Sequence, residues 1–185
     1  MSGRMVVALG CALAALGGPA IADSRVTAAY AFSWAGIDVA ELEMEVVELG
    51  GSYKVVWNGR MVGMLGMLFP FEASGLASGD RTAGDYLPRQ YASSSQWRDG
   101  GGTWRVTFAP DSGVAAVEGP PVDTEEREPV PAALRVRPDP ASLALAAIMA
   151  ARPGASMTAT SFDGKRAVRF ALTCDNGTPP PDGML

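Results

Sequence analysis

The sequence predicts a mostly β fold, in which a curved antiparallel sheet or incomplete β-barrel wraps around one main helix. Two observations lead to this prediction. Only the stretch from Asp139 to Arg152 has the residues of a long helix, whereas most other segments alternate apolar and polar residues between glycine-rich turns, as strands do. The helical stretch is apolar all round, so other elements have to cover it on more than one side. A sheet curved around the helix is the simplest cover.

The helix has clear signals at both ends. Asp139 is a good N-cap residue and Pro140 suits the first helical position, while Arg152 is followed by Pro153 and Gly154, which stop a helix. Ser142 is the only polar residue between these ends, and no charged residue interrupts them.

An antiparallel meander of strands is predicted for the first part of the chain. Apolar residues alternate from Val26 to Trp34 and again from Ala40 to Val46, where glutamates fill the outward positions. Gly50 and Gly51 then form a turn before a third strand, Tyr53 to Trp57. From Met61 to Phe71 the alternation of apolar and polar residues stops. Because glycines interrupt this segment, we expect either a short helical turn or a bent strand.

Four further strands and a final hairpin complete the predicted β structure. Successive strands with short turns favour a meander over parallel βαβ units. From Gly119 to Pro138, prolines and acids predict an extended surface crossing that leads to the helix. The predicted strands are Glu72–Ser78, Leu87–Trp97, Trp104–Phe108, Val114–Val117, Met157–Phe162 and Arg166–Cys174, the last two joined at Asp163-Gly164.

The N-terminus has the pattern of an export signal. Arg4 precedes an apolar run, and Ala20-Ile21-Ala22 forms a cleavage site, so we expect a Sec signal peptide over residues 1–22. A lipoprotein signal acylated at Cys11 is disfavoured, because the apolar run before that cysteine is short. Residues 23–174 then form a single β-rich domain, and the Pro-rich tail, 175–185, is expected to be disordered. We expect no membrane span after cleavage.

Composition narrows the classes of function. The net charge of −5 becomes −6 when Arg4 leaves with the signal peptide, which disfavours nucleic acids and anionic membrane surfaces. The chain contains no histidine, which excludes histidine-dependent hydrolase triads and histidine-based zinc sites. Cys174 has no partner cysteine in the mature chain, so no internal disulfide is expected and its role stays open. No cofactor or metal is predicted.

Carboxylates offer one candidate for chemistry. Glu41, Glu43 and Glu45 share one face of a predicted strand, where they could bind a cation or supply a carboxylate pair for glycan hydrolysis. A solvated strand face explains them more simply. The hydrolase alternative requires two acids to meet in one pocket, from the set Glu41, Glu43, Glu45, Glu72, Asp80 and Asp85.

An apolar site is the other candidate. Methionine side chains adapt to varied ligands, and the Met-rich run could line a cavity together with the helix. An ordinary packed core explains the same residues, and both explanations remain open. The candidate lining residues are Trp57, Met61, Met64, Met67, Leu68, Phe71, Leu145, Ile148 and Met149.

Several short segments, in order, resemble the exported bacterial family catalogued as domain of unknown function 3108. The resemblance spans Tyr30 to Leu172. It rests on segments 30–37 (YAFSWAGI), 63–66 (GMLG), 74–75 (SG), 87–91 (LPRQY), 139–143 (DPASL) and 162–166 (FDGKR).

This resemblance implies a periplasmic protein of Gram-negative bacteria, with an incomplete barrel similar to the periplasmic lipoprotein carriers of the LolA/LolB type. It implies no established activity and no catalytic residue. Such proteins continue with more strand after the last hairpin, whereas this chain stops at Leu185, as a C-terminal truncation would explain. Such a truncation would also remove any cysteine partner of Cys174.

We therefore expect a non-enzymatic periplasmic envelope protein that binds a lipid or other apolar ligand between sheet and helix. A packed interaction module, recruiting an envelope protein partner through an exposed strand edge, is the first alternative. The carboxylate-based glycan hydrolase is the second.

Overall fold

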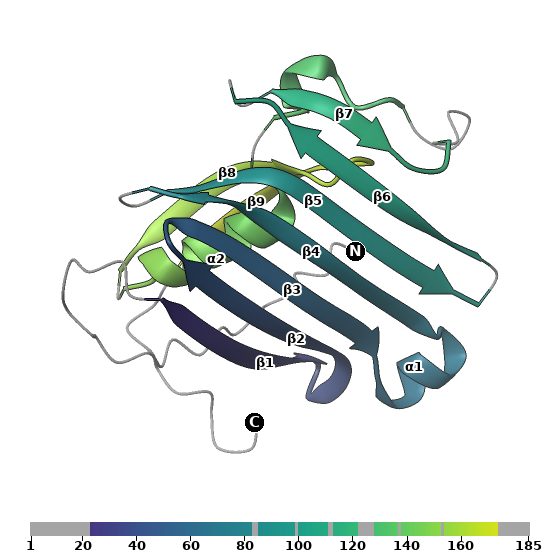
Figure 1. The fold of residues 1–185 in the computed structure, drawn as a ribbon. Helices are drawn as coiled ribbons and strands as arrows, with labels where there is room; N and C mark the ends of the chain where they lie inside the picture. Colours follow the sequence, from purple (N-terminus) through teal and green to yellow (C-terminus); the bar gives the residue numbers. More distant parts are fainter. Residues whose placement is uncertain are drawn as a thin grey trace.

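Seven strands form one antiparallel sheet in chain order, as the computed structural model of the protein shows (Figure 1). The structure describes residues 23–173, apart from 83–84, 99, 111–112, 122–127, 137 and 153. The sheet is not closed into a barrel, because β1 and β7 form its two edges. The strands are β1 Ser24–Trp34, β2 Ile37–Leu49, β3 Ser52–Met61, β4 Phe71–Arg81, β5 Tyr86–Trp97, β6 Gly100–Phe108 and β7 Val114–Glu118. The predicted mostly β fold with an incomplete barrel is confirmed.

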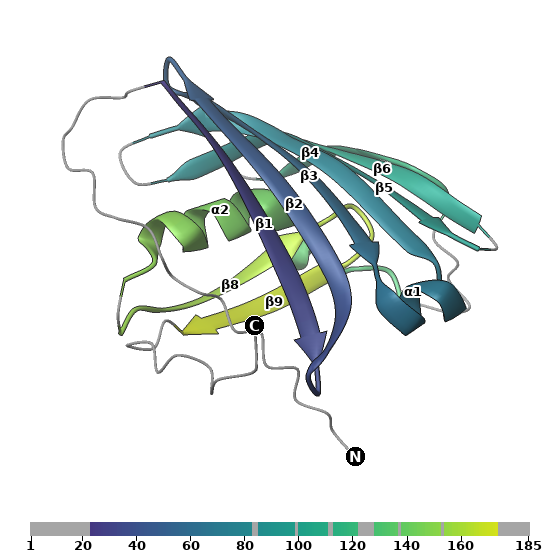
Figure 2. The same cartoon turned by 90° about the horizontal axis from the view of Figure 1, so that it is seen from below.

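One face of this sheet is covered by a helix and a hairpin. Helix α2, Pro140–Ala150, contacts β3, β4 and β5, and it also contacts β8, Ser156–Phe162. Strand β8 pairs with β9, Ala167–Thr173, in a separate two-stranded sheet. Figure 2 shows α2 and the β8–β9 hairpin on the same side of the large sheet. The helix is thus covered on more than one side, as its apolar sequence requires.

The core lies between α2, the hairpin and the middle of the sheet. We call the sheet face that contributes to this core the inner face. Alternate residues of the strands point into it, so the period-2 pattern of the sequence is confirmed in β2 and β3. The buried apolar side chains of the core are Met44, Tyr53, Val55, Ala77, Tyr86, Tyr91, Val106, Phe108, Ala141, Leu145 and Phe162.

The start of α2 has the predicted cap. Oδ1 of Asp139 accepts hydrogen bonds from the backbone N–H groups of Ala141, at 2.9 Å, and Ser142, at 3.0 Å. These bonds satisfy two of the donors that every helix start leaves without an intrahelical partner. The helix ends at Ala150, two residues before the predicted Arg152.

The structure decides between the two predictions for the Met-rich run and differs from the prediction for the crossing after β7. Between β3 and β4 lies a short helix, α1 (Gly63–Leu68), so the helical reading of the Met-rich run is the correct one. The crossing after β7 is not wholly extended, because it contains a 3-10 turn, η1 (Ala132–Leu134). After this turn, Val136 forms an isolated antiparallel bridge with Gly113. The predicted signal peptide, Cys174 and the tail lie outside the described residues.

Candidate apolar binding face

The inner face of the sheet has two parts with different cover. Beneath α2 it is closed, and Val55 and Ala77 have no exposed surface. Toward α1 the same strands continue past the helix (Figure 2), and their inward side chains are only partly covered. Trp57 and Met61 of β3 are half-buried there, and Trp97 of β5 is 51% exposed. We call this second part the open inner face.

Apolar and small side chains make up the open inner face. The rings of Phe71 and Trp97, on paired strands, have centroids 4.3 Å apart. No charged side chain lies at the inward positions of the three strands that form it. These positions are Trp57, Gly59 and Met61 of β3, Phe71, Ala73 and Gly75 of β4, and Ser93, Ser95 and Trp97 of β5.

Glycines allow two tryptophan rings to lie close against the sheet. A Cβ atom on Gly75 would come within 2.6 Å of the Trp57 ring, so the indole covers the bare backbone of the neighbouring strand. The ring of Trp104 lies in the same way against Gly102 and Gly119, where added Cβ atoms would approach within 2.6 and 2.5 Å. Both rings therefore form part of the floor of the sheet's inner side.

The hairpin turn closes the β6–β7 side of the inner face. Lys165 places its ammonium group 4.6 Å from the centre of the Trp104 ring, in a cation–π contact. A Cβ atom on Gly164, which has a φ of +93°, would meet Val106 at 3.0 Å. This close approach holds the hairpin turn against β6.

The candidate residues on α2 belong mainly to the closed core. Leu145 is 3% exposed, and Ile148 is partly buried against the core cluster, as Trp57 is. Met149 is 55% exposed. On the described part of the chain, hollows of about 490 and 460 Å³ are present, and neither of these includes a residue of α2 in its lining.

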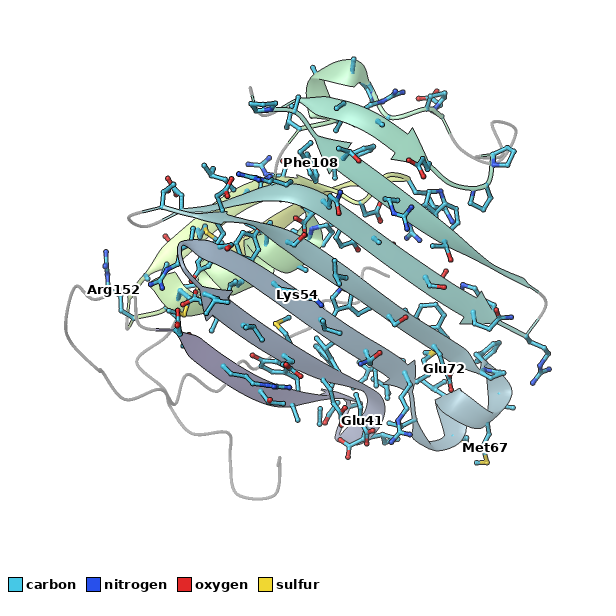
Figure 3. The ribbon with its side chains drawn as sticks, in the orientation of Figure 1. Glu41, Lys54, Met67, Glu72, Phe108 and Arg152 are labelled. Carbon is cyan, nitrogen blue, oxygen red and sulfur yellow. The ribbon has the colours of Figure 1, made fainter. Side chains whose placement is uncertain are left out.

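The candidate residues on α1 lie at the far end of the open inner face. Met64, Met67 and Leu68 are 61%, 76% and 55% exposed. Figure 3 shows Met67 projecting from α1 at the outer end of the sheet. The nine predicted residues therefore fall into three groups, on α2, on the open inner face and on α1. Only Trp57, Met61 and Phe71 share the open inner face.

Sequence reasoning missed Trp97 and Trp104 as members of the inner face. The register was the missing information, since Trp97 pairs with Phe71 and Trp104 pairs with Ser93 across neighbouring strands. One signal was present in the sequence, namely glycines at inward positions of strands that also carry tryptophans.

The acids of β2 lie on the opposite, outer face of the sheet. Glu41, Glu43 and Glu72 line the hollow of about 490 Å³, together with Arg60 and several polar side chains. Figure 3 shows Glu41 and Glu72 toward the end of the sheet that carries α1. Arg60 donates two hydrogen bonds to one carboxylate oxygen of Glu41, at 3.0 and 2.7 Å. Glu41 raises the pKa of the Arg60 guanidinium through this hydrogen bond and through its charge. This arrangement engages one of the three carboxylates in an ion pair.

Other predicted acids are placed elsewhere. Glu45 pairs with Arg25 at 2.8 Å, and Asp80 pairs with Arg89 at 2.7 Å. Three of the six acids considered for hydrolysis thus line one hollow. Asp80 lines the other.

A series of buried hydrogen bonds connects α2 to the sheet. Ser142 donates to Oδ2 of Asp139 at 2.6 Å, and its oxygen lies 2.6 Å from the phenol oxygen of Tyr53 on β3. Asp139 is fully buried, and burial raises its pKa to about 6, although the hydrogen bonds from Ser142 and Ala141 act in the opposite direction. Burial also raises the pKa of Tyr91.

A second buried group joins four strands, β1, β2, β4 and β5. Oε1 of Glu48 accepts a hydrogen bond from Tyr86 at 2.5 Å, and Oε2 accepts bonds from Arg81 at 2.7 Å and Ser24 at 3.2 Å. Burial, together with the bond to Glu48, raises the pKa of the Tyr86 phenol. The Tyr86 ring meets the Tyr53 ring edge-on, with centroids 5.1 Å apart. These contacts account for the buried polar side chains of Glu48, Asp139 and Ser142, whereas the buried hydroxyl of Ser161 has no hydrogen-bond partner among the described residues.

Among the described residues, no group of three or more histidines, cysteines or acids is placed to hold a metal ion. None of the helices within the described part of the chain has the length and apolar character needed to cross a membrane.

Comparison with known proteins identifies the family. No curated protein and no solved structure matches the chain. The family model described as "Protein of unknown function (DUF3108)" matches residues 29–177, which is well over half of the sequence. The resemblance seen in the short segments of the sequence is thereby confirmed, and the chain belongs to the DUF3108 family.

Proposed function

We propose that this protein is a non-enzymatic, exported protein of the periplasm that binds one apolar chain, such as the acyl chain of a lipid, on the open inner face. The observation that carries the proposal is the continuation of the apolar inner face beyond the cover of α2. Trp57, Met61 and Phe71 remain half-buried there, although deeper residues of the same strands are fully buried.

Apolar surface left in contact with water favours an occupant. Removing such surface from water contributes about 25 cal/mol per Å². An acyl chain fits the chemistry of the open inner face, because its inward positions carry only apolar residues, glycines and small serines. Met61 adds an unbranched side chain that adapts to different ligand shapes. A lipid headgroup would remain at the edge, in water.

The N-terminal pattern of residues 1–22 supports export. Fractionation of cells that express the full chain tests this part of the proposal. Recovery in the periplasm with an N-terminus at Asp23 is expected, and recovery of uncleaved protein in the cytoplasm would contradict it.

Two adjacent serines allow a matched test of ligand binding. Ser95 faces the inner side, since it pairs with Ala73 and Gly102, whereas Ser94 lines the outer hollow. Ser95→Asp places a charge on the open inner face, and Ser94→Asp places the same charge outside. Lipid extraction and native mass spectrometry of the purified proteins should show bound lipid in the parent and in Ser94→Asp. The Ser95→Asp protein should retain at least about tenfold less lipid, because a carboxylate is costly in an apolar site.

Protein that is always empty, or equal lipid in both variants, would overturn lipid binding. Circular dichroism and thermal unfolding must confirm that both variants are folded.

A packed interaction module that uses a strand edge is the second candidate. Strand β1 is an eleven-residue edge of the sheet and offers backbone groups for pairing with another chain. Stoichiometric co-purification of an envelope protein, lost when Ala29 on β1 is replaced by proline, would favour this function over lipid binding.

The glycan-hydrolase alternative depends on Glu41, Glu43 and Glu72 around the outer hollow. Release of reducing ends from cell-wall glycans that Glu72→Gln abolishes would favour it, and would contradict the non-enzymatic proposal.

A further inference from the structure

The end of the sheet that carries α1 exposes an unusual number of large apolar side chains. They come from the β1–β2 turn, from α1 and the residue after it, and from the end of β5 (Figure 1). We call this set the apolar tip. It consists of Trp34, Ile37, Met64, Met67, Leu68, Phe69 and Trp97, which are between 51% and 76% exposed.

Contacts between these turns make the apolar tip continuous. The backbone N–H of Val62 donates to the carbonyl oxygen of Val39 at 3.1 Å, which places the start of α1 beside the start of β2. On the other side, Arg98 donates to the carbonyl oxygen of Leu68 at 3.2 Å. α1 is thus held between the β1–β2 turn and the end of β5.

The opposite end of the sheet differs in character. Its β2–β3 turn carries one exposed apolar side chain, Leu49, beside Gly50, Gly51 and Ser52. The described part of the β4–β5 connection there contributes Thr82 and Asp85. Nine large apolar side chains among the described residues are more than half exposed, and seven of them belong to the apolar tip, the other two being Leu49 and Met149. The stretch from Met61 to Phe71 contains no polar side chain at all.

We propose that the apolar tip docks into the surface of a lipid bilayer. The proposal goes beyond ligand binding on the open inner face and does not depend on it. Tryptophan is enriched where proteins meet the membrane interface, and Trp34 and Trp97 flank α1 on its two sides. Methionine, leucine and phenylalanine from α1 would enter the region below the headgroups. Figure 3 shows Met67 projecting beyond the end of the strands.

A bilayer fits the apolar tip better than a second protein does. A stable protein interface uses about 20–30 residues on each side. The apolar tip provides seven side chains on projecting turns. Separate side chains can insert individually into a fluid bilayer, because the bilayer does not need a surface complementary in shape to the apolar tip.

Charges around the apolar tip predict which lipids it prefers. Asp38, Glu41 and Glu72 lie near it, against Arg60 and Arg98. Acids therefore outnumber bases, which matches the net negative charge of the chain. We expect binding to zwitterionic bilayers, and weaker binding when anionic lipid is added, with salt restoring part of the loss.

Vesicle flotation with the purified protein tests the proposal. Phosphatidylcholine vesicles should carry the parent protein, and lipids brominated on their acyl chains should quench tryptophan fluorescence. Met67→Glu should lower the partition coefficient at least about tenfold, because a charge replaces an inserted side chain. Leu49→Glu is the matched control, since Leu49 is 60% exposed at the opposite end, and it should bind as the parent does.

A second variant guards against the case in which Met67→Glu fails to fold, because it is expected to keep vesicle binding. Trp34→Phe combined with Trp97→Phe should retain vesicle binding but lose most of the quenching. Equal partition of Met67→Glu and Leu49→Glu, or a dimer in solution that only Met67→Glu dissociates, would overturn bilayer docking. Ser95→Asp separates the two proposals, because it should lower lipid retention at least about tenfold while vesicle flotation persists.

Discussion

The oxygen atoms of Tyr53 and Ser142 lie 2.6 Å apart in the core, and this contact joins strand β3 to the first turn of α2. Ser142 donates the hydrogen bond of its hydroxyl to Oδ2 of Asp139, so the phenol of Tyr53 is the donor toward the Ser142 oxygen. Residues far apart in the sequence thereby fix the height and rotation of the helix over the sheet. The position of α2 in turn decides how much of the inner face stays open.

Removing the phenol oxygen of Tyr53 should weaken the packing of α2 on the sheet. We expect Tyr53→Phe to lower the free energy of unfolding by about 1–2 kcal/mol, since a buried hydrogen bond is lost. Ser142→Ala removes the other partner. Urea denaturation of both single variants and the double variant should give a coupling energy of about 0.5–2 kcal/mol. Purely additive effects would show that the contact contributes nothing.

Asp139 should make stability depend on pH in an unusual direction. Its pKa is raised from 3.8 to about 6 in the folded protein, so the folded state binds the proton more tightly than the unfolded state. Its contribution to stability is therefore fully present below pH 3.8 and is lost as the pH rises through about 6.

Asp139→Asn removes this titration and keeps an acceptor for the helix cap. The difference in unfolding free energy between parent and variant should change by about 2 kcal/mol between about pH 4 and pH 7. The parent should lose stability relative to the variant as the pH rises. Denaturant titrations at several pH values measure the difference, and a constant difference would contradict the raised pKa.

Gly75 should be intolerant of even one added carbon atom. An alanine Cβ would lie 2.6 Å from the Trp57 ring, so Gly75→Ala must displace the indole from the sheet. We expect a loss of about 1–3 kcal/mol in stability, as for other overpacked sites. The near-ultraviolet circular dichroism of the tryptophans should change as well.

A smaller partner should rescue the Gly75 variant. Trp57→Leu combined with Gly75→Ala should be more stable than the sum of the two single effects predicts. Gly51→Ala is not a suitable control, because Gly51 has a φ of +82° and would be strained for a different reason. Ala73→Gly, one inward position away on β4, tests the cost of strand glycine alone.

Glu48 should contribute much more stability than its neighbour Glu45. Glu48 is 6% exposed and accepts bonds from Tyr86, Arg81 and Ser24, so Glu48→Gln leaves donors facing an amide N–H₂ group. We expect a loss of about 2–4 kcal/mol. Glu45→Gln on the outer side of the same strand breaks a solvent-exposed pair with Arg25, and should cost about 1 kcal/mol or less. Thermal unfolding of both variants gives the comparison.

Local chemistry was enough to predict α2 and most of the strands. Asp139, Pro140 and the uninterrupted apolar run specify a helix through caps and propensity, which act within a few residues. The alternation in β2 likewise separates buried Met44 from outward Glu43. The end of α2 and the bounds of β4 were less accurate, because packing rather than propensity decides where such elements stop.

The sequence by itself determined the fold class, the capped apolar helix and its need for cover on more than one side. It did so because side-chain period and capping are local properties. Only the tertiary structure decided that Leu145 fills the core while Trp57, Met61 and Phe71 lie on a surface that α2 does not reach. That division depends on strand register and on the Tyr53–Ser142 contact, which fixes where the first turn of a short helix lies over a longer sheet. Neither property can be read from neighbours in the chain, because both arise between residues that folding alone brings together.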